Sequence, residues 1–549
     1  MGGGLMQLVA YGAQDVYLTG NPQITFWKVS YRRHTNFAME SIEQTFNGQA
    51  DFGRRVTCTI SRNGDLAYRT YLQVTLPEIG NTGAPDNSAN TGIYARWLDC
   101  PGEQLISQVE VEIGGQRIDR QYGDWMHIWN QLTLSADQKR GYDKMIGNTT
   151  QLTYVCDPSF AAVDGPCDST APRQVCAPRM ALPETTLYVP LQFWYCRNPG
   201  LALPLIALQY HEVKINLDLR PIDECLWACK SMGDATATTG SSPVQKVTSA
   251  YQQSLVAASL YVDYVFLDSD ERRRMAQKPH EYLIEQLQFT GDESVGSSSN
   301  KIKLNFNHPC KELVWVVQPD ANVDYCESVE GGKDLFKVFG AQPFNYTDAI
   351  DALPNAIHAF AGPGTAGAGQ FIAAGNTDAN GNVTESNTFV DAGAGTAAAA
   401  TDPWWSTDRT NMTSTMMSGV SDAGVFVLAE TALDLHCWGE NPVVTAKLQL
   451  NGQDRFSERE GTYFDLVQPY QSHTRSPDTG INVYSFALRP EEHQPSGSCN
   501  FSRIDNATLQ LVLSNATVEY TNTAKVRVYA TNYNVLRVTS GMGGLAYSN

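Results

Sequence analysis

The sequence predicts an all-β protein built from two β-sandwiches, with short helices and long inter-strand loops. Three observations carry this prediction. Short segments in which apolar and polar residues alternate recur along the chain, as in half-buried antiparallel strands. Only 18% of the 549 residues are charged while 10% are aromatic, a profile that favours strands and large interfaces. A strand-turn pattern of the first half also returns in the second half, which indicates a duplication.

The first half contains alternating segments at residues 56–60, 72–76, 109–113 and 213–219. Two of its turns carry specific signals. Asn63-Gly64 is the dipeptide of a type I′ turn, so we expect the segments on either side of it to form a β-hairpin. Gly114-Gly115 ends the third segment and predicts a second tight turn.

The only convincing helix of the first half follows Asp124, which we expect to be its N-cap. Trp125, Ile128, Trp129 and Leu132 then fall at i, i+3, i+4 and i+7, the spacing of one helix face. We expect this helix to pack on the edge of a sandwich.

The second half repeats the strand pattern, with alternating segments at residues 302–306, 448–450, 509–513 and 526–528, and the turn dipeptide Asn451-Gly452 after the second of them. Segments 110–126 and 447–464 also resemble each other. Each has an alternating strand, a Gly-Gln turn, an arginine, and a glycine two residues before an aromatic residue. We interpret this as a duplicated sandwich; the alternative is two unrelated β domains that use the same turn chemistry.

Two segments break the strand pattern. Residues 229–250 are mostly small and polar. We therefore expect a linker at 223–255. Residues 358–400 hold 13 Ala and 8 Gly, too little apolar bulk to build a core. We therefore expect a long loop insertion at about 319–440 that is displayed from the second sandwich.

The charge balance of 39 − 58 = −19 argues against a protein that wraps nucleic acid, because an acidic surface repels phosphate. Nothing approaches the length of an apolar membrane span or resembles a secretory signal. The sequence lacks the G-x-S-x-G, H-E-x-x-H and P-loop motifs and a C-x-x-C pair. We therefore predict no enzyme, and no catalytic, cofactor-binding or metal-binding residues.

Two kinds of candidate modification site stand out. Cys156, Cys167 and Cys176 lie in one proline-containing, strand-poor segment and are candidates for a loop disulfide, while the other cysteines are expected to be reduced. Asparagines in N-x-[ST] sequons are candidates for glycosylation; we select Asn148, Asn345, Asn382 and Asn411.

Long strings of the sequence closely resemble the major capsid proteins of nucleocytoplasmic large DNA viruses of the algal-virus and mimivirus-like kind. They are LVAYGAQDVYLTGNPQITFWKVSYRRHTNFAMESI (8–42), ISRNGDL (60–66), NPGLALPLIALQYHEVKI (198–215), YVFLDSDERRRMAQKPHEYLIEQLQ (264–288) and PSGSCNFSRIDNATLQL (495–511). The resemblance spans nearly the whole chain. The Ala/Gly-rich insertion and the cysteine-bearing segment 134–185 match no motif of that family.

The resemblance implies two tandem eight-stranded jelly rolls. The expected division is an N-terminal arm (1–25), a first roll (26–222), the linker (223–255) and a second roll (256–549). It further implies a homotrimer of pseudo-hexagonal outline that contacts neighbouring capsomers in an icosahedral shell. Minor capsid proteins are expected on the inner face and a viral membrane nearby but not inserted, with assembly in the host cytoplasm and a final place in the virion.

A protein of another class remains open from the residues alone. A tandem sandwich that acts by itself as a carbohydrate-binding or adhesin protein would also be aromatic-rich, because aromatic rings stack on sugars. A jelly-roll hydrolase would need carboxylates that converge in a cleft, which leave no sequence signature.

Overall fold

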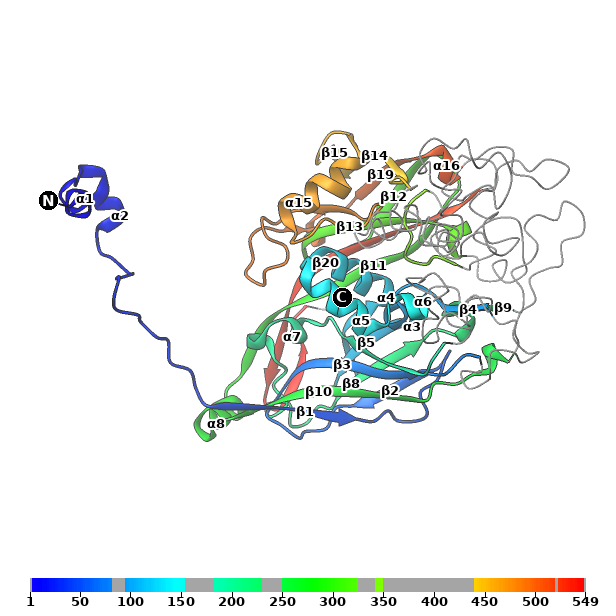
Figure 1. The fold of residues 1–549 in the computed structure, drawn as a ribbon, viewed down its shortest axis with the longest axis horizontal. Coiled ribbons are helices and arrows are strands. Elements are labelled where there is room, and N and C mark those ends of the chain that lie inside the picture. Colours follow the sequence, from blue (N-terminus) through cyan, green and yellow to red (C-terminus); the bar gives the residue numbers. More distant parts are fainter. Residues whose placement is uncertain are drawn as a thin grey trace, which may run out of the picture.

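The computed structural model describes residues 2–80, 94–153, 182–229, 249–323, 341–348, 439–518 and 522–547. Within these residues the chain forms two β-sandwiches, one above the other in Figure 1. Among the same residues, no helix has the length and apolar character that a membrane crossing requires.

The first sandwich consists of two four-stranded antiparallel sheets. One sheet has the order β1 (Phe37–Gln44), β10 (Ala257–Leu267), β3 (Leu66–Leu76), β7 (Thr185–Pro190), and the other β2 (Arg55–Thr59), β8 (Val213–Leu219), β5 (Ile106–Ile113), β6 (Gln116–Tyr122). A small ribbon pairs β4 (Tyr94–Trp97) with β9 (Leu226–Cys229). The accompanying helices are α3 (Pro101–Leu105), α4 (Gly123–Thr133), α5 (Ala136–Ile146), α6 (Thr150–Thr153) and α7 (Trp194–Arg197).

The second sandwich repeats this arrangement. One sheet has the order β11 (His280–Val295), β20 (Ala524–Thr539), β13 (Pro309–Pro319), β17 (Asn482–Ser485), with β18 (Cys499–Asn500) and β21 (Met542–Leu545) added at its margins; the other has the order β12 (Ser299–Leu304), β19 (Ala507–Leu513), β14 (Val443–Leu450), β15 (Gln453–Asp454), with β16 (Arg459–Glu460) beside β14. Its helices are η8 (Tyr463–Val467), α15 (Gln468–Ser472) and α16 (Asn515–Val518), and α8 (Ser269–Gln277) joins the two sandwiches.

The strand orders of the two sandwiches correspond one to one. In each, one sheet has the order β1–β10–β3–β7 or β11–β20–β13–β17, and the facing sheet has the order β2–β8–β5–β6 or β12–β19–β14–β15. This is the jelly-roll connection, in which the chain passes between the facing sheets except at the hairpins β5–β6 and β14–β15. The duplication predicted from segments 110–126 and 447–464 is confirmed as a tandem of two jelly rolls.

The core does not follow the boundary between the rolls. Leu313, Trp315 and Val317 of β13 point into the second roll, whereas Val314 and Val316 point outward and join the apolar cluster of the first roll. All five side chains are fully buried. A strand buried on both faces is apolar at every position rather than at alternate ones, and the sequence LVWVV at 313–317 shows this pattern.

Most of the predicted strands are confirmed, and two of the three turn predictions are. Gly114 and Gly115 have φ of 58° and 85°, and Asn451 and Gly452 have φ of 50° and 80°. These left-handed conformations join β5 to β6 and β14 to β15 as tight hairpins.

The predicted hairpin around Asn63-Gly64 is wrong. β2 pairs with β8 and β3 pairs with β10 and β7, so the two flanking strands lie in different sheets. The dipeptide has no left-handed residue, and a Cβ on Gly64 would lie 2.7 Å from Cβ of Tyr264. Glycine is needed here because β10 crosses close to the connection between the sheets.

Helix α4 contains the predicted apolar face, with Trp125, Ile128, Trp129 and Leu132 all buried. Its N-cap is Tyr122, however, and not Asp124 as predicted. Asp124 lies in the first turn, where its carboxylate forms ion pairs with Arg220 and Arg527. The side chain that looked like a cap therefore makes long-range contacts instead.

The sheet pairing differs from the expected division of the chain. β10 follows the expected linker but pairs with β1 and β3 of the first roll. The first roll therefore extends to Leu267, and the chain passes to the second roll at α8 rather than within 223–255. Much of that linker, and the insertion at 319–440 apart from residues 319–323, 341–348 and 439–440, lies outside the described residues.

Candidate assembly surfaces

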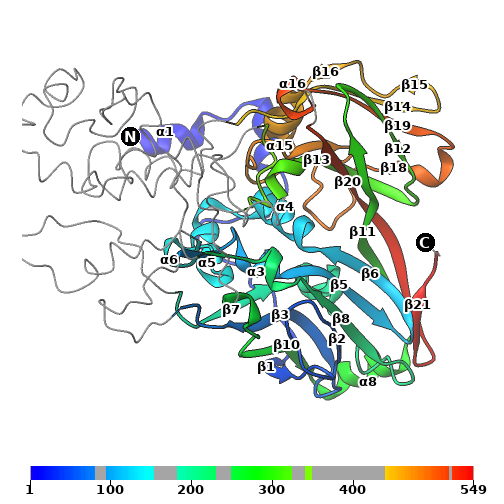
Figure 2. The same cartoon turned by 90° about the vertical axis from the view of Figure 1, so that its right-hand side faces the viewer.

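The seam between the two rolls is lined by aromatic side chains from both rolls. Trp125 of α4 packs against Tyr529 of β20, with ring centroids 5.4 Å apart. Tyr122 of β6 meets Phe289 of β11 edge-on at 5.0 Å, and Phe289 stacks on Tyr529 at 4.8 Å. The outer face of the β11–β20–β13–β17 sheet is thereby covered by β6 and α4 of the first roll (Figure 2).

Ion pairs and hydrogen bonds cross the same seam. Arg527 of β20 lies 2.7 Å from Asp124 of α4. Burial alone would lower the pKa of Arg527, but the Asp124 carboxylate raises it above its usual value. The backbone N–H of Leu287 donates to Oδ1 of Asp119 at 3.1 Å. Burial raises the pKa of Asp119 to about 7, although this hydrogen bond and Arg197 act in the opposite direction.

A buried charge cluster lies at one end of the seam. The Glu285 carboxylate of β11 forms ion pairs with Lys311 of β13 at 2.7 Å and with Arg197 of α7 at 3.3 Å. Basic side chains from both rolls therefore contact one carboxylate. Burial would raise the pKa of Glu285, but His493, Lys311 and Arg197 hold it at about 2. The Arg197 guanidinium also lies 3.8 Å from the ring centroid of Trp129, a cation–π contact.

His473 is a second buried charge. It follows α15 and lies between two carboxylates, with Nε2 3.0 Å from Glu312 and Nδ1 2.9 Å from Glu491. Burial would lower the pKa of His473, but Glu312 and Glu491 outweigh this and raise it to about 9. The imidazolium is therefore charged at neutral pH and fixes the loop that follows α15 to β13.

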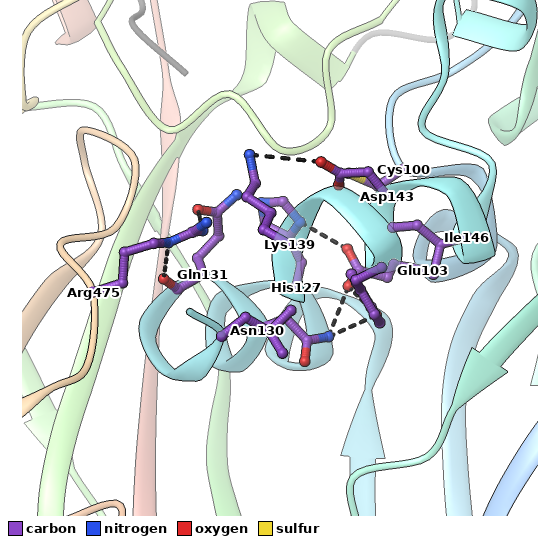
Figure 3. Close-up of a pocket in the computed structure, with 11 residues that line it drawn as sticks. Cys100, Glu103, His127, Asn130, Gln131, Lys139, Asp143, Ile146 and Arg475 are labelled. Atoms are coloured by element: carbon purple, nitrogen blue, oxygen red, sulfur yellow. Dashed lines mark hydrogen bonds and ion pairs between the residues drawn. The ribbon is translucent and has the colours of Figure 1, made fainter. Parts of the chain in front are cut away.

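A small polar cavity lies beside the seam, under α3, α4 and α5 (Figure 3). Glu103 is its central group. One carboxylate oxygen accepts from Asn130 Nδ2 at 2.9 Å and from the Tyr142 hydroxyl at 2.7 Å, and the other faces His127 Nδ1 at 2.8 Å. The cavity measures about 10 Å³, space for one water molecule.

Within the described residues, Cys100, Glu103 and His127 bring their ligand atoms within 4.8 Å of one another. A thiolate, a carboxylate and an imidazole are donors that suit Zn²⁺. Here Glu103 already accepts three hydrogen bonds, and burial together with Glu103 raises the pKa of the Cys100 thiol well above its usual value. The cluster therefore ties α3 to α4 and α5. Sequence spacing carried no signal for it, because Glu103 and His127 lie on different helices.

The N-terminal arm exposes apolar side chains. It consists of α1 (Gly3–Val9), α2 (Val16–Thr19) and an extended segment that leads to β1, and it stands away from both rolls (Figure 1). Its exposed large side chains are Leu5, Met6, Leu8, Val9, Tyr11, Val16, Tyr17, Leu18, Ile24, Phe26, Trp27, Val29 and Tyr31. A patch of this extent marks an interaction site.

Of the site residues predicted from sequence, the structure describes Asn345 and Asn148. Asn345 is buried and its amide donates to Gln342, which leaves no room for a glycan, so this candidate is withdrawn. Asn148 is half-buried after α5. Cys156, Cys167, Cys176, Asn382 and Asn411 lie outside the described residues. Among the described residues, the cysteines at 58, 100, 196, 225, 310 and 499 are free thiols.

Two jelly rolls packed on each other, with an exposed apolar arm, are features of a structural protein that assembles with other chains. The comparisons with known proteins agree. A family model for the large eukaryotic DNA virus major capsid protein matches residues 271–544, and one for the major capsid protein N-terminus matches residues 25–268. The chain belongs to this family of major capsid proteins and is a structural component of a virion.

Curated relatives match over the full length of both chains. The major capsid protein of Phaeocystis pouchetii virus is 76% identical, that of Chrysochromulina ericina virus 73% and that of Paramecium bursaria Chlorella virus 1 39%. Among solved structures, PBCV-1 VP54 is 33% identical with a TM-score of 0.59, covering 96% of this chain and all of that one. The Faustovirus major capsid protein, at 13% identity and a TM-score of 0.61 over 96% and 94%, shares the fold.

Proposed function

We propose that three copies of this chain form a pseudo-hexagonal homotrimeric capsomer, and that these capsomers tile the icosahedral shell of a large DNA virus. The duplicated fold carries the proposal. Two rolls of the same strand order per chain give six similar sandwiches in three chains, which supplies a six-sided outline from a three-fold assembly. The resemblance to PBCV-1 VP54 over 96% of the chain supports it.

The N-terminal arm supplies the contact with the interior of the shell. Its apolar side chains are exposed in the single chain, so we assign to them the contacts with minor capsid proteins on the inner face of the shell. The viral membrane lies nearby, and the arm does not enter it. The net charge of −19 opposes direct contact with the genome. The free thiols of the described cysteines agree with assembly in the reducing host cytoplasm.

The size and outline of the purified recombinant chain test the capsomer. Native mass spectrometry should give three times the 60.3 kDa mass of the chain, and negative-stain imaging should show three-fold particles with a hexagonal outline. A stable 60.3 kDa monomer that binds glycans would overturn the proposal in favour of a carbohydrate-binding or adhesin protein.

Removal of residues 1–36, the whole segment before β1, separates the two roles. The shortened chain should still form a trimer, because the arm stands away from both rolls, but it should fail to form shells when co-expressed with the other virion proteins. Normal shells from the shortened chain would contradict the role of the arm.

A further inference from the structure

Two cysteines face each other on neighbouring strands of the second roll. β18 is two residues long and pairs antiparallel with the start of β13, which places Cys499 directly opposite Cys310. The other cysteines in the described strands, Cys58 and Cys229, lie opposite an isoleucine and a tyrosine. The sheet register therefore brings two thiols together at one place in the described part of the chain.

The two side chains lie on the same face of the sheet. Residues directly opposite each other in an antiparallel pair have Cα atoms about 4.5–5.5 Å apart, and their side chains are neighbours. Disulfides join residues whose Cα atoms are about 4.4–6.8 Å apart. Cys310 belongs to the apolar core of the second roll, and Cys499 packs against that core. The register therefore suits a cross-strand disulfide.

The two thiols differ in their access to solvent. Cys310 is fully buried, and its Sγ lies 3.6 Å from the backbone oxygen of Asn307, whereas Cys499 is half-buried. Burial raises the pKa of both thiols. The nearby Cys499 sulfur raises the pKa of Cys310 further, while Arg455 acts in the opposite direction on Cys499. A dissolved oxidant therefore reaches Cys499 first, and Cys310 is the thiol that completes the bond.

A bond at this position fastens a short strand to the buried centre of its sheet. β13 is buried along nearly its whole length, whereas β18 offers two residues for pairing. The chain is also held here by the backbone N–H of Phe501, which donates to the carbonyl oxygen of His308 at 3.1 Å. A link from 310 to 499 closes a long loop that includes β14 and β17, and long loops gain the most from a cross-link in the chain-entropy model.

We propose that Cys310 and Cys499 are a redox modification site, at which an intrachain disulfide forms when the folded chain passes from a reducing to an oxidising medium. The oxidant is a low-molecular-weight disulfide of the glutathione type. The Cys499 thiolate attacks one sulfur of the oxidant, which forms a mixed disulfide and releases one thiolate. Cys310 then loses its proton, and its sulfur attacks the Cys499 sulfur and releases the second thiolate.

The electrons and protons of this exchange balance. The two protein thiols are oxidised by two electrons, and one oxidant disulfide is reduced to two thiols, which take up the two protons. The site goes beyond the proposed capsomer. Assembly in a reducing cytoplasm keeps the two thiols free, and an oxidising medium outside the cell then locks the second roll of the finished shell. The bond forms within a single chain, so its test does not depend on trimer formation.

Peptide mapping of the full chain tests the bond directly. The purified chain is exposed to oxidised glutathione or to dithiothreitol, alkylated under denaturing conditions and digested with trypsin without reduction. Trypsin separates the two cysteines, because Cys310 lies in fragment 304–311 and Cys499 in fragment 476–503. After oxidation, mass spectrometry should find the two fragments joined. After dithiothreitol, each fragment should appear alone and alkylated.

Thermal unfolding measures what the bond does to the fold. Oxidation should raise the Tm of the wild-type chain by about 4–8 °C, because the cross-link restricts the unfolded chain, and dithiothreitol should reverse the gain. Cys499→Ser should lose the gain and unfold alike in both media. Cys196→Ser is the matched control, because Cys196 is also a half-buried free thiol but lies in the first roll, outside any strand; this variant should keep the gain.

Each result decides for or against the site. Joined fragments, with a gain in Tm that Cys499→Ser loses, support it. Separate alkylated fragments after oxidation, or Cys499 joined to a cysteine other than Cys310, overturn it. Joined fragments without a gain in Tm leave the modification site standing and overturn its stabilising role. The fragment map needs no variant, so it remains decisive if circular dichroism shows that Cys499→Ser does not fold.

Discussion

The two equivalent sheet faces of this molecule differ in composition. The outer face of the second roll carries Val314 and Val316, which are fully buried against the first roll. The outer face of the first roll carries Tyr71, Tyr188 and Tyr261 at solvent-accessible positions. A face that is covered within the chain never meets water after folding and can be aliphatic. A face that is covered only in an assembly must first be soluble, and tyrosine offers an apolar ring with a hydroxyl group.

The largest expected effect comes from breaking the charge cluster on the covered face. Lys311→Met removes a fully buried partner 2.7 Å from Glu285. It should lower the free energy of unfolding by about 3–5 kcal/mol, the usual cost of removing one partner from a buried ion pair, although Arg197 still pairs with Glu285. Urea denaturation measures this.

Lys447→Met is the control for that variant. Lys447 pairs with Asp454 at the same distance of 2.7 Å, but both side chains are partly exposed, so the loss should stay below about 1 kcal/mol. Equal losses for the two lysine variants would show that burial of the cluster does not matter.

Trp125 packs against Tyr529 across the seam, and replacing it measures how much this apolar contact contributes to stability. Trp125→Ala should lower the free energy of unfolding by about 3–5 kcal/mol, because it leaves a cavity between α4 and Tyr529. The corresponding change in the second roll, Tyr463→Ala, should cost less, since Tyr463 is only half-buried. If thermal unfolding ranked the two variants in the opposite order, α4 would not be the element that joins the rolls.

The two counterpart glycines should behave alike. Gly123→Ala and Gly461→Ala each place a Cβ against a strand carbonyl, so each should destabilise the chain by about 1–3 kcal/mol through overpacking. Gly141→Ala is the control, because its Cβ meets nothing within 4 Å and alanine is favoured in a helix. A neutral result at one of the two counterparts would argue against their structural equivalence.

The pH dependence of the seam follows from Asp119. Burial raises the pKa of this carboxyl from 3.8 to about 7 in the folded chain, so the folded state binds the proton more tightly than the unfolded state. Its contribution to stability is fully present below pH 3.8 and is lost as the pH rises through 7. Asp119→Asn keeps an oxygen for the N–H of Leu287 and does not titrate.

The measurement is the difference in Tm between pH 5 and pH 8. The wild-type chain should lose more stability over this range than Asp119→Asn, and the contributions of other groups cancel in the comparison. Identical pH dependence would mean that Asp119 stays ionised in the seam.

The smallest effect on folding is expected at Tyr188, on the outer face of the first roll. Tyr188→Ser should change the free energy of unfolding of the single chain by less than about 0.5 kcal/mol, the usual range for an exposed position, since Tyr188 is 40% exposed. Thermal unfolding at concentrations where the chain is monomeric measures this. A loss comparable to that of Trp125→Ala would show that the exposed Tyr188 ring supports the fold of the single chain.

The sequence by itself determined the local features. Alternation set which face of β5, β8 and β19 is buried, the positive-φ dipeptides at Gly114-Gly115 and Asn451-Gly452 marked two hairpins, and the resemblance between 110–126 and 447–464 revealed the duplication. These features depend on residues within a few positions of one another, so the pattern is readable in a linear sequence.

The tertiary structure alone decided which distant strands pair and which charges meet. Asn63-Gly64 has the composition of a hairpin but connects two sheets, and β10 returns to the first roll from beyond the expected linker to pair with β3. The ion pairs of Asp124 with Arg527, and of Glu285 with Arg197 and Lys311, also join residues that lie far apart in the sequence. Such contacts are set by the order of strands in the sheets and by the packing of one roll on the other, and that order leaves no trace in local spacing.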